Sequence, residues 1–311
     1  KISNMSQSTV RGVDVSSYVA LQNAGVKFYD YNGEEAPLMQ ILKENGVNYI
    51  RIRLWIDPKD ENGNTYGGGN NDTETGIKIA TDATRYGMKV MLNFQYSDFW
   101  TDPSQQVLPK SWKDDKDDPA KMRNNIYTYT KNTIQQFLDE VPGIDIGMVQ
   151  IGNEITNGVF GEIANRDNGG RYTAVWGNEK TSKKVNSYLN AGAKAVRDTV
   201  PETLIVLQLE TPNIKKYTDI MNTWKRDNVD YDVLGSSFYP FWTQDWTVEG
   251  VPNANTISNL EKIQELAASY GKLFVVAETA WVNNVNDSDG THNAIGEADN
   301  TSAYEVGPQG Q

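Results

Sequence analysis

Two acidic residues, Glu154 and Glu278, each stand at the end of a short apolar run that predicts a buried strand. The first run is Met148-Val-Gln-Ile-Gly-Asn-Glu154, and the second is Leu273-Phe-Val-Val-Ala-Glu278. An ionised glutamate is almost never fully buried without a partner, so structure alone gives a poor reason for a carboxylate at either place. Two strands that each deliver a carboxylate at the carboxyl end supply the pair that a glycosidase requires.

The alternative is that both glutamates lie at the rim of the fold and form structural salt bridges there. As a catalytic pair, carboxyl groups about 5–5.5 Å apart would retain the anomeric configuration, and groups about 6.5–9.5 Å apart would invert it. The acid must stay protonated while its partner stays ionised, so their surroundings must differ. Three neighbours at strand ends could assist: Asn153 by donating to a sugar hydroxyl, Arg53 by holding the nucleophile ionised, and Tyr239 by hydrogen bonding to a carboxylate.

Aromatic residues are abundant, with 16 Tyr and 8 Trp, and six of the tryptophans follow predicted strand ends. These six are Trp55, Trp100, Trp112, Trp242, Trp246 and Trp281. A flat ring can stack on the apolar face of a pyranose, although large aromatic side chains also pack in any core. Trp281, three residues past Glu278, is the strongest candidate for contact with a sugar.

The amino-acid composition limits the kinds of partner that the protein is expected to bind. The formal net charge is −12, which argues against nucleic acid and anionic membranes and fits a neutral polymer better than an anionic one. No apolar run approaches 18 residues, so we expect no membrane-spanning segment. The chain opens on a polar stretch that resembles a mature start, and it contains no Cys and a single His, His292.

A helix, a glycine and a short apolar strand follow one another three times, around Gly46, Gly87 and Gly271. This order is typical of βα units in a parallel sheet. The expected strands are 10–15, 49–55, 89–94, 144–152, 204–209, 231–238 and 273–278, and the expected helices are 36–45, 75–86, 118–139, 185–200, 214–226 and 257–270. Their alternation predicts an α/β fold, a (β/α)8 TIM barrel.

A doubly wound sheet is the alternative fold, but its glycine-rich first turn is missing, because Gly67-Gly-Gly69 follows a loop rather than a strand. No eighth strand is readable, since residues 283–311 are polar with almost no apolar run. We therefore expect one catalytic domain over residues 1–311, truncated at its C-terminal end, with the eighth βα unit not visible in the sequence.

A further cluster of oxygen ligands lies in the stretch Asp287-Ser-Asp-Gly-Thr-His-Asn293. Asp287, Asp289 and Asn293 suit a hard cation such as Ca²⁺, and His292 could join them. The spacing is not that of an EF-hand, and a solvated turn is the alternative.

The motifs resemble glycoside hydrolase family 53, the endo-β-1,4-galactanases of clan A. The matching stretches are Arg11-Gly-Val-Asp14, Tyr49-Ile-Arg-Ile-Arg-Leu-Trp55, Gly87-Met-Lys-Val90, Tyr96-Ser-Asp98, Val149-Gln-Ile-Gly-Asn-Glu-Ile-Thr-Asn-Gly158, Ser237-Phe-Tyr-Pro240 and Val276-Ala-Glu-Thr279. They run across nearly the whole chain, and the stretch around Glu154 is the most specific of them.

The resemblance implies that Glu154 is the acid/base, that Glu278 is the nucleophile, and that the configuration is retained. It also implies that Asn153 serves the sugar 2-hydroxyl and that Arg53 and Tyr239 lie beside the nucleophile. We further expect Gln95, Asp98, Trp100 and Trp242 to belong to the substrate site, and the loop after the seventh strand to bind calcium, as in some members of the family. The sequence departs from the family pattern at Asn93, usually acidic, and at Gln95 and Thr243, both usually His. An amide in place of imidazole keeps hydrogen bonding and loses a titratable proton.

We therefore expect a secreted or cell-surface, monomeric endo-glycosidase that acts on β-1,4-galactan or arabinogalactan and needs no cofactor for its chemistry. Calcium would have a structural role. Two alternatives stay open at this point. One is a glycan-binding protein that has lost turnover, and the other is a clan A enzyme for another β-1,4 glycan such as mannan.

Overall fold

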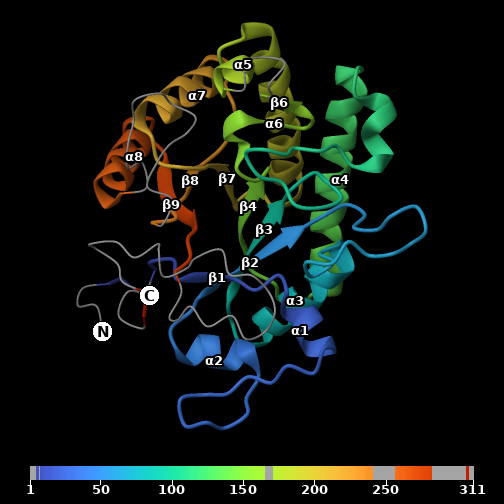
Figure 1. Ribbon diagram of the computed structural model, residues 1–311, viewed down its shortest axis with the longest axis vertical. Coiled ribbons are helices and arrows are strands. Elements are labelled where there is room, and N and C mark those ends of the chain that lie inside the picture. Colours follow the sequence, from blue (N-terminus) through green and yellow to red (C-terminus); the bar gives the residue numbers. More distant parts are fainter. Residues whose placement is uncertain (1–4, 7, 165–170, 241–255, 282–305, 308–311) are drawn as a thin grey trace.

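Parallel strands surrounded by helices form the described part of the molecule (Figure 1). The computed structural model describes residues 5–6, 8–164, 171–240, 256–281 and 306–307. Seven strands pair in the order β1-β2-β3-β4-β7-β8-β9, every pair parallel. They are β1 (Gly12–Asp14), β2 (Tyr49–Leu54), β3 (Lys89–Phe94), β4 (Ile146–Ile151), β7 (Leu204–Leu209), β8 (Val233–Ser237) and β9 (Leu273–Glu278).

Helices connect these strands and cover the outer face of the curled sheet (Figure 1). They are α1 (Tyr18–Asn23), α2 (Leu38–Glu44), α3 (Thr73–Arg85), α4 (Pro119–Glu140), α5 (Thr173–Trp176), α6 (Glu179–Thr199), α7 (Ile214–Arg226) and α8 (Ile257–Ser269). Two 3₁₀ turns, η1 (Lys110–Asp115) and η2 (Ile155–Asn157), and a hairpin of β5 (Gly158–Val159) with β6 (Glu162–Ile163) lie in the connecting loops.

The architecture is a (β/α)8 TIM barrel, as the sequence predicts. All seven predicted strands are confirmed, three with the predicted bounds and four with somewhat shorter ones. The glycines expected after helices also have the left-handed backbone that their place requires, with φ of 89° at Gly46, 65° at Gly87 and 69° at Gly271. Within the described residues the sheet runs from β1 to β9, and no described strand pairs with the free edge of either. The short helices α1 and α5 were not predicted, because neither is long enough to show a periodic pattern.

Alternation along each strand divides the side chains into two sets. Residues such as Ile52, Leu92 and Leu207 pack outward into the main core under the helices. Residues of the other set face the barrel interior, where Met91, Met148, Val206 and Val233 form a separate apolar cluster. Nearer the carboxyl ends the inward positions become polar and remain buried, namely Asn93, Gln150, Gln208 and Ser237. The polar inner layer therefore lies at the edge where barrel enzymes place their active sites.

The outward set gives a test of what stabilises the barrel. Leu207 of β7 is fully buried in the main core. Truncation to alanine should therefore lower the free energy of unfolding by about 2–5 kcal/mol, measured by urea denaturation. Leu21→Ala on the exposed face of α1 is the matched control and should cost less than about 1 kcal/mol. Equal losses for the two variants would contradict this assignment of the core.

Candidate active site

Glu154 follows β4 at a sharp turn in the backbone. Gly152 has φ of 76°, and a Cβ there would meet Ile155 Cγ2 at 2.6 Å, so the position requires glycine. Glu154 itself has φ of 48° and ψ of 53°, a left-handed conformation that a glutamate rarely adopts. Such strain persists where the surroundings hold it, and it gathers at functional sites. The turn directs the carboxyl group into the barrel mouth, where Ser237 Oγ donates a hydrogen bond of 2.5 Å to Oε1.

Glu278 reaches the interior through an irregularity in β9. Ser236 pairs with Val276, but Ser237 pairs with Glu278, so the register skips one residue. A regular strand would place Glu278 on the face opposite to Ala277, which packs against the interior cluster. The extra residue redirects the side chain, as bulges beside active sites do.

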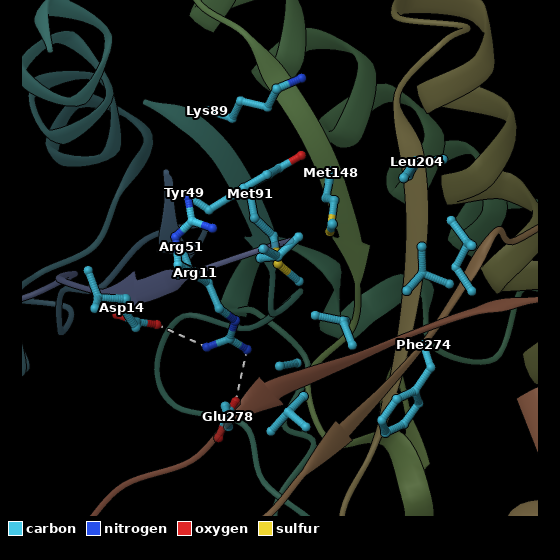
Figure 2. A pocket seen from close by; sticks show the side chains of 18 of the residues that line it. Arg11, Asp14, Tyr49, Arg51, Lys89, Met91, Met148, Leu204, Phe274 and Glu278 are labelled. Atoms are coloured by element: carbon cyan, nitrogen blue, oxygen red, sulfur yellow. Dashed lines mark hydrogen bonds and ion pairs between the residues drawn. The ribbon is translucent and has the colours of Figure 1, made fainter. Parts of the chain in front are cut away.

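Three donors hold the carboxylate of Glu278. Arg51 Nη2 and Gln208 Nε2 donate to Oε1 at 2.8 Å and 3.0 Å, and the Tyr239 hydroxyl donates to Oε2 at 3.0 Å. Arg51 also forms an ion pair of 2.9 Å with Asp14 on β1, so its guanidinium bridges two carboxylates. Figure 2 shows this bridge as dashed lines from Asp14 to Glu278, at one end of a cavity of about 1530 Å³.

The two glutamates lie close to each other. Gln208 Nε2, which donates to Glu278, also donates to Ser237 Oγ at 2.9 Å, and Ser237 in turn contacts Glu154. Three consecutive contacts of 2.5, 2.9 and 3.0 Å keep the two Oε1 atoms within about 9 Å, the range in which two carboxyl groups can act on one glycosidic bond.

The two carboxyl groups have different electrostatic surroundings. Burial, followed by the charge of Glu278, raises the pKa of Glu154 well above its ordinary value. Glu278 instead has a guanidinium at 2.8 Å. Burial and the charges of Glu278 and Glu154 also raise the pKa of Tyr239, so its hydroxyl stays a donor at neutral pH. One group therefore suits a proton donor and the other an ionised nucleophile.

Arg51, which the sequence analysis did not select, makes the ion pair with Glu278 that was expected of Arg53. Arg53 lies 3.7 Å from Asp14, and its guanidinium stacks 3.8 Å from the ring centroid of Trp100. Both arginines alternate onto the inner face of β2, so the sequence pattern alone cannot tell them apart. Gln208 was also missed, because a single buried polar residue in a strand carries no motif. Ser237 was missed although it begins the matching stretch Ser237-Phe-Tyr-Pro240, because a lone hydroxyl at a strand end indicates no role by itself.

The remaining predicted residues divide into two groups. Asn153 joins the pair, because its Oδ1 accepts from Arg51 and Asn93 while its Nδ2 donates to Thr101 O. Gln95 and Asp98 instead hold loops. Gln95 Oε1 accepts from Trp55 Nε1 and Thr101 N.

Asp98 accepts from the backbone of Asp57 and from both the backbone and the ammonium of Lys110. These bonds occupy both of its carboxylate oxygens and tie the loops after β2 and β3 together. Within this loop region Trp100 is 38% exposed, so part of its ring is open for stacking.

Trp281 is described and partly exposed, three residues beyond β9. Trp242 and the predicted calcium ligands Asp287, Asp289, His292 and Asn293 lie outside the described residues. Within the part of the chain that the structure describes, no group of three or more His, Asp or Glu side chains could hold a metal ion, and no helix could span a membrane.

A barrel with two such carboxyl groups at its carboxyl edge defines a class, the barrel glycosidases. A model of glycosyl hydrolase family 53 matches residues 10–311. An endo-β-1,4-galactanase of Bacillus subtilis is 39% identical over 313 residues, which cover 100% of this chain and 66% of the relative. An arabinogalactan endo-β-1,4-galactanase of Humicola insolens is 32% identical over 279 residues, 87% of this chain and 74% of the relative.

A solved catalytic domain of family 53 from Ignisphaera aggregans superposes with a TM-score of 0.85 at 33% identity, covering 100% of this chain and 79% of that one. This chain belongs to glycosyl hydrolase family 53. The family and the enzyme class expected from the sequence are therefore confirmed. The chain spans slightly less than two thirds of the Bacillus relative, at 66% of its length.

The raised pKa of Glu154 has a consequence for stability. A carboxyl group whose pKa is higher in the folded than in the unfolded chain stabilises the fold below the unfolded pKa, about 4.3 for Glu. This stability is lost as the pH rises through the folded pKa. Glu154→Gln should therefore match the parent near pH 4 and exceed its free energy of unfolding near pH 7 by about 1–3 kcal/mol, measured in urea.

Glu61→Gln, in an exposed loop after β2, is the matched control and should change stability by less than about 0.5 kcal/mol at either pH. Equal stability of the parent and Glu154→Gln at pH 7 would show that burial of the Glu154 carboxyl group is not unfavourable.

Proposed function

We propose that this chain is a retaining endo-glycosidase that hydrolyses β-1,4-galactosidic bonds in galactan or arabinogalactan. The observation that carries the proposal is the pair of Glu154 and Glu278, linked through Ser237 and Gln208 at the carboxyl edge of the barrel. The names of the relatives support the substrate, because they are endo-β-1,4-galactanases and arabinogalactan endo-β-1,4-galactanases.

The reaction would proceed by two displacements. Glu278 attacks the anomeric carbon while Glu154 gives its proton to the glycosidic oxygen, so the bond to the leaving sugar breaks as a galactosyl ester forms. Glu154 then takes a proton from water, the water oxygen attacks the same carbon, and Glu278 leaves as a carboxylate. Two inversions at one carbon give net retention. The raised pKa of Glu154 supports its role as the acid, and the ion pair with Arg51 supports Glu278 as the nucleophile.

The surroundings of the pair support a neutral carbohydrate as the substrate. The chain has a formal net charge of −12, which would repel a polyanion. Trp100 presents a partly exposed ring beside Arg53, and such a ring can stack on the apolar face of a galactose unit. Asn153, buried beside Arg51, is placed next to the acid in the chain and is proposed to serve a sugar hydroxyl.

We further infer that the protein acts outside the cell, because its polymeric substrate cannot cross a membrane. The monomeric state expected from the sequence stays a proposal. The stretch 287–293 remains a proposed calcium loop, and the oxygen donors of Asp287, Asp289 and Asn293 support it. The proposal of a single catalytic domain rests on the continuous alternation of strands and helices.

Alanine variants of the two glutamates should separate their roles. Glu154→Ala removes the general acid, so kcat/KM on galactan should fall by about 10²–10⁴-fold. An aryl galactobioside with a dinitrophenolate leaving group needs no proton to depart, so its glycosylation burst should persist in this variant. Glu278→Ala removes the nucleophile and should abolish turnover of both substrates. Stopped-flow release of dinitrophenolate checks the prediction, and loss of the burst in Glu154→Ala would contradict the assignment of the acid.

A panel of polysaccharides tests the substrate. New reducing ends should appear from β-1,4-galactan and arabinogalactan at rates at least about tenfold above those from β-1,4-mannan or cellulose. The axial 4-hydroxyl of galactose gives the polysaccharide a different shape, so a site that fits galactan should fit the other two poorly. Glu278→Ala is the matched control for contaminating activity. Faster release from mannan would overturn the choice of sugar, and calorimetric binding of galactan without any release would indicate a binding protein.

A further inference from the structure

Two buried polar residues, Gln208 and Ser237, connect the carboxyl groups of Glu154 and Glu278. Gln208 is fully buried near the end of β7, and Ser237 is almost fully buried at the end of β8. Gln208 Nε2 donates to Ser237 Oγ at 2.9 Å and to Glu278 Oε1 at 3.0 Å, and Ser237 Oγ donates to Glu154 Oε1 at 2.5 Å. Neither residue is available to contact a sugar, so their function lies in what they do to the two glutamates.

The other contacts of Gln208 fix the orientation of its amide. Its Oε1 accepts from Gln150 Nε2 at 2.6 Å and from the backbone N–H of Glu154 at 3.2 Å. Both partners are donors, so the oxygen of Gln208 must face them and its two N–H groups must face Ser237 and Glu278. The same side chain therefore supports the strained backbone of Glu154 and the carboxylate of Glu278.

The direction of the Ser237 hydrogen bonds follows from this orientation. A serine hydroxyl has one proton and can accept further bonds through its oxygen. Because Gln208 can only donate to it through Nε2, the proton of Ser237 is free to point at Glu154. The hydrogen bonds therefore all point in one direction, from Gln208 through Ser237 to Glu154, and a second bond runs from Gln208 to Glu278.

We propose that Gln208 and Ser237 are positioning residues that couple the acid and the nucleophile, so that charge lost at Glu278 and charge gained at Glu154 are balanced through one chain of hydrogen bonds. The proposal rests on the two-carboxylate function proposed above. It assigns neither residue a chemical step.

The coupling matches the movement of charge in the first displacement. The bond between Glu278 and the anomeric carbon forms, the glycosidic bond breaks, and the proton of Glu154 passes to the leaving oxygen. Glu278 thereby loses its negative charge and Glu154 acquires one. A hydrogen bond to an ionised acceptor is about twice as strong as one to a neutral acceptor. The donor from Gln208 to Glu278 therefore weakens as the donor from Ser237 to Glu154 strengthens, without any side chain having to move.

Other charged and titratable groups face the same two carboxyl groups. They come from each neighbouring element: Asp14 on β1, Arg51 and Arg53 on β2, Asp102 after β3, Glu210 after β7 with its buried partner Lys216 on α7, and Tyr239 after β8. Variants of Gln208 and Ser237 leave all of these charges in place, so a changed titration of Glu154 reports the hydrogen-bonded chain.

The first experiment titrates the Glu154 carboxyl group directly, by ¹³C NMR of protein labelled at glutamate carboxyl carbons, with Glu154→Gln for assignment. Ser237 donates to the ionised form, so Ser237→Ala should raise the titration midpoint by about one pH unit. Ser237→Thr keeps the hydroxyl and should restore the midpoint. Ser236→Ala is the matched control, because this buried serine on the same strand bonds Tyr217 rather than the acid, and it should leave the midpoint unchanged.

The second experiment measures kcat and KM on galactan for Gln208→Met, which keeps the length of the side chain but removes its donors. Since Gln208 does not contact the sugar, kcat should fall about tenfold while KM stays within about twofold. Thermal unfolding confirms that each variant is folded. If Ser237→Ala fails to fold, Ser237→Cys, with a weak S–H donor, should raise the midpoint in the same direction.

The coupling would be overturned by a folded Ser237→Ala whose Glu154 midpoint equals that of the parent, or by an equal rise in Ser236→Ala. An unchanged kcat in Gln208→Met would also overturn it. A parent protein that releases no sugar from any polysaccharide, yet shows the expected shift of the midpoint, would refute the proposed function and leave only the effect of Ser237 on the titration of Glu154.

Discussion

The buried guanidinium of Arg51 is the constraint on which the site depends. A cation almost removed from water is very unfavourable unless it is paired and hydrogen bonded. Arg51 meets this need with Asp14 on β1 and Glu278 on β9, the two edge strands of the described sheet. Its further bonds to Gln150 and Asn153 add acceptors from the β4 segment. One side chain therefore holds together strands that are distant in the sheet, and it fixes Glu278, the proposed nucleophile, as it does so.

The same arrangement explains why the two glutamates can differ. Glu278 forms an ion pair with Arg51, whereas the described contacts of the Glu154 carboxyl group include a neutral hydroxyl and no cation, and burial raises the pKa of Glu154. Asp14 is a buried carboxyl group whose pKa is lowered rather than raised. Burial alone would raise its pKa, but the guanidinium groups of Arg51 and Arg53 and hydrogen bonds from Ser16 together lower it. At Asp14 the nearby cations and hydrogen bonds together therefore outweigh burial.

Periodicity in the sequence predicts the barrel because seven apolar strands alternate with helices and glycines mark the helix ends. Alternation does not decide the direction of Glu154, because β4 ends at Ile151 and the left-handed turn at Gly152 and Glu154 directs the carboxyl group inward. The same rule fails for Glu278. Val275 and Ala277 face the interior, so alternation would turn Glu278 outward, and only the skipped register at Ser237 brings it in.

For a related reason, the sequence does not reveal whether Arg51 or Arg53 pairs with Glu278. Both face inward, and which of them reaches Glu278 depends on the stagger between β2 and β9, two strands that never pair in the described sheet. Gln208 and Ser237 escape prediction because a single amide or hydroxyl in an apolar strand looks like a tolerated substitution. The side-chain partners of Gln208 and Ser237 described here are 29 or more positions away in the chain, and only the folded structure reveals them.

The hydrogen bonds around Arg51 and Asn153 give a physical reason for the departures from the family pattern at Asn93 and Gln95. Asn93 donates to Asn153 Oδ1 at 3.0 Å, and Arg51 donates to the same oxygen at 2.8 Å, which leaves Asn153 Nδ2 to bond Thr101 O. A carboxylate at position 93 would bring a third negative group towards Arg51, beside Asp14 and Glu278, and compete with Glu278 for it. An amide at position 93 or 95 cannot titrate, so hydrogen bonds made there keep their direction at every pH. The neutral residues at these two positions thus leave the positive charge of Arg51 to Asp14 and Glu278, and they add no titratable group to the layer that holds the two proposed catalytic carboxyl groups.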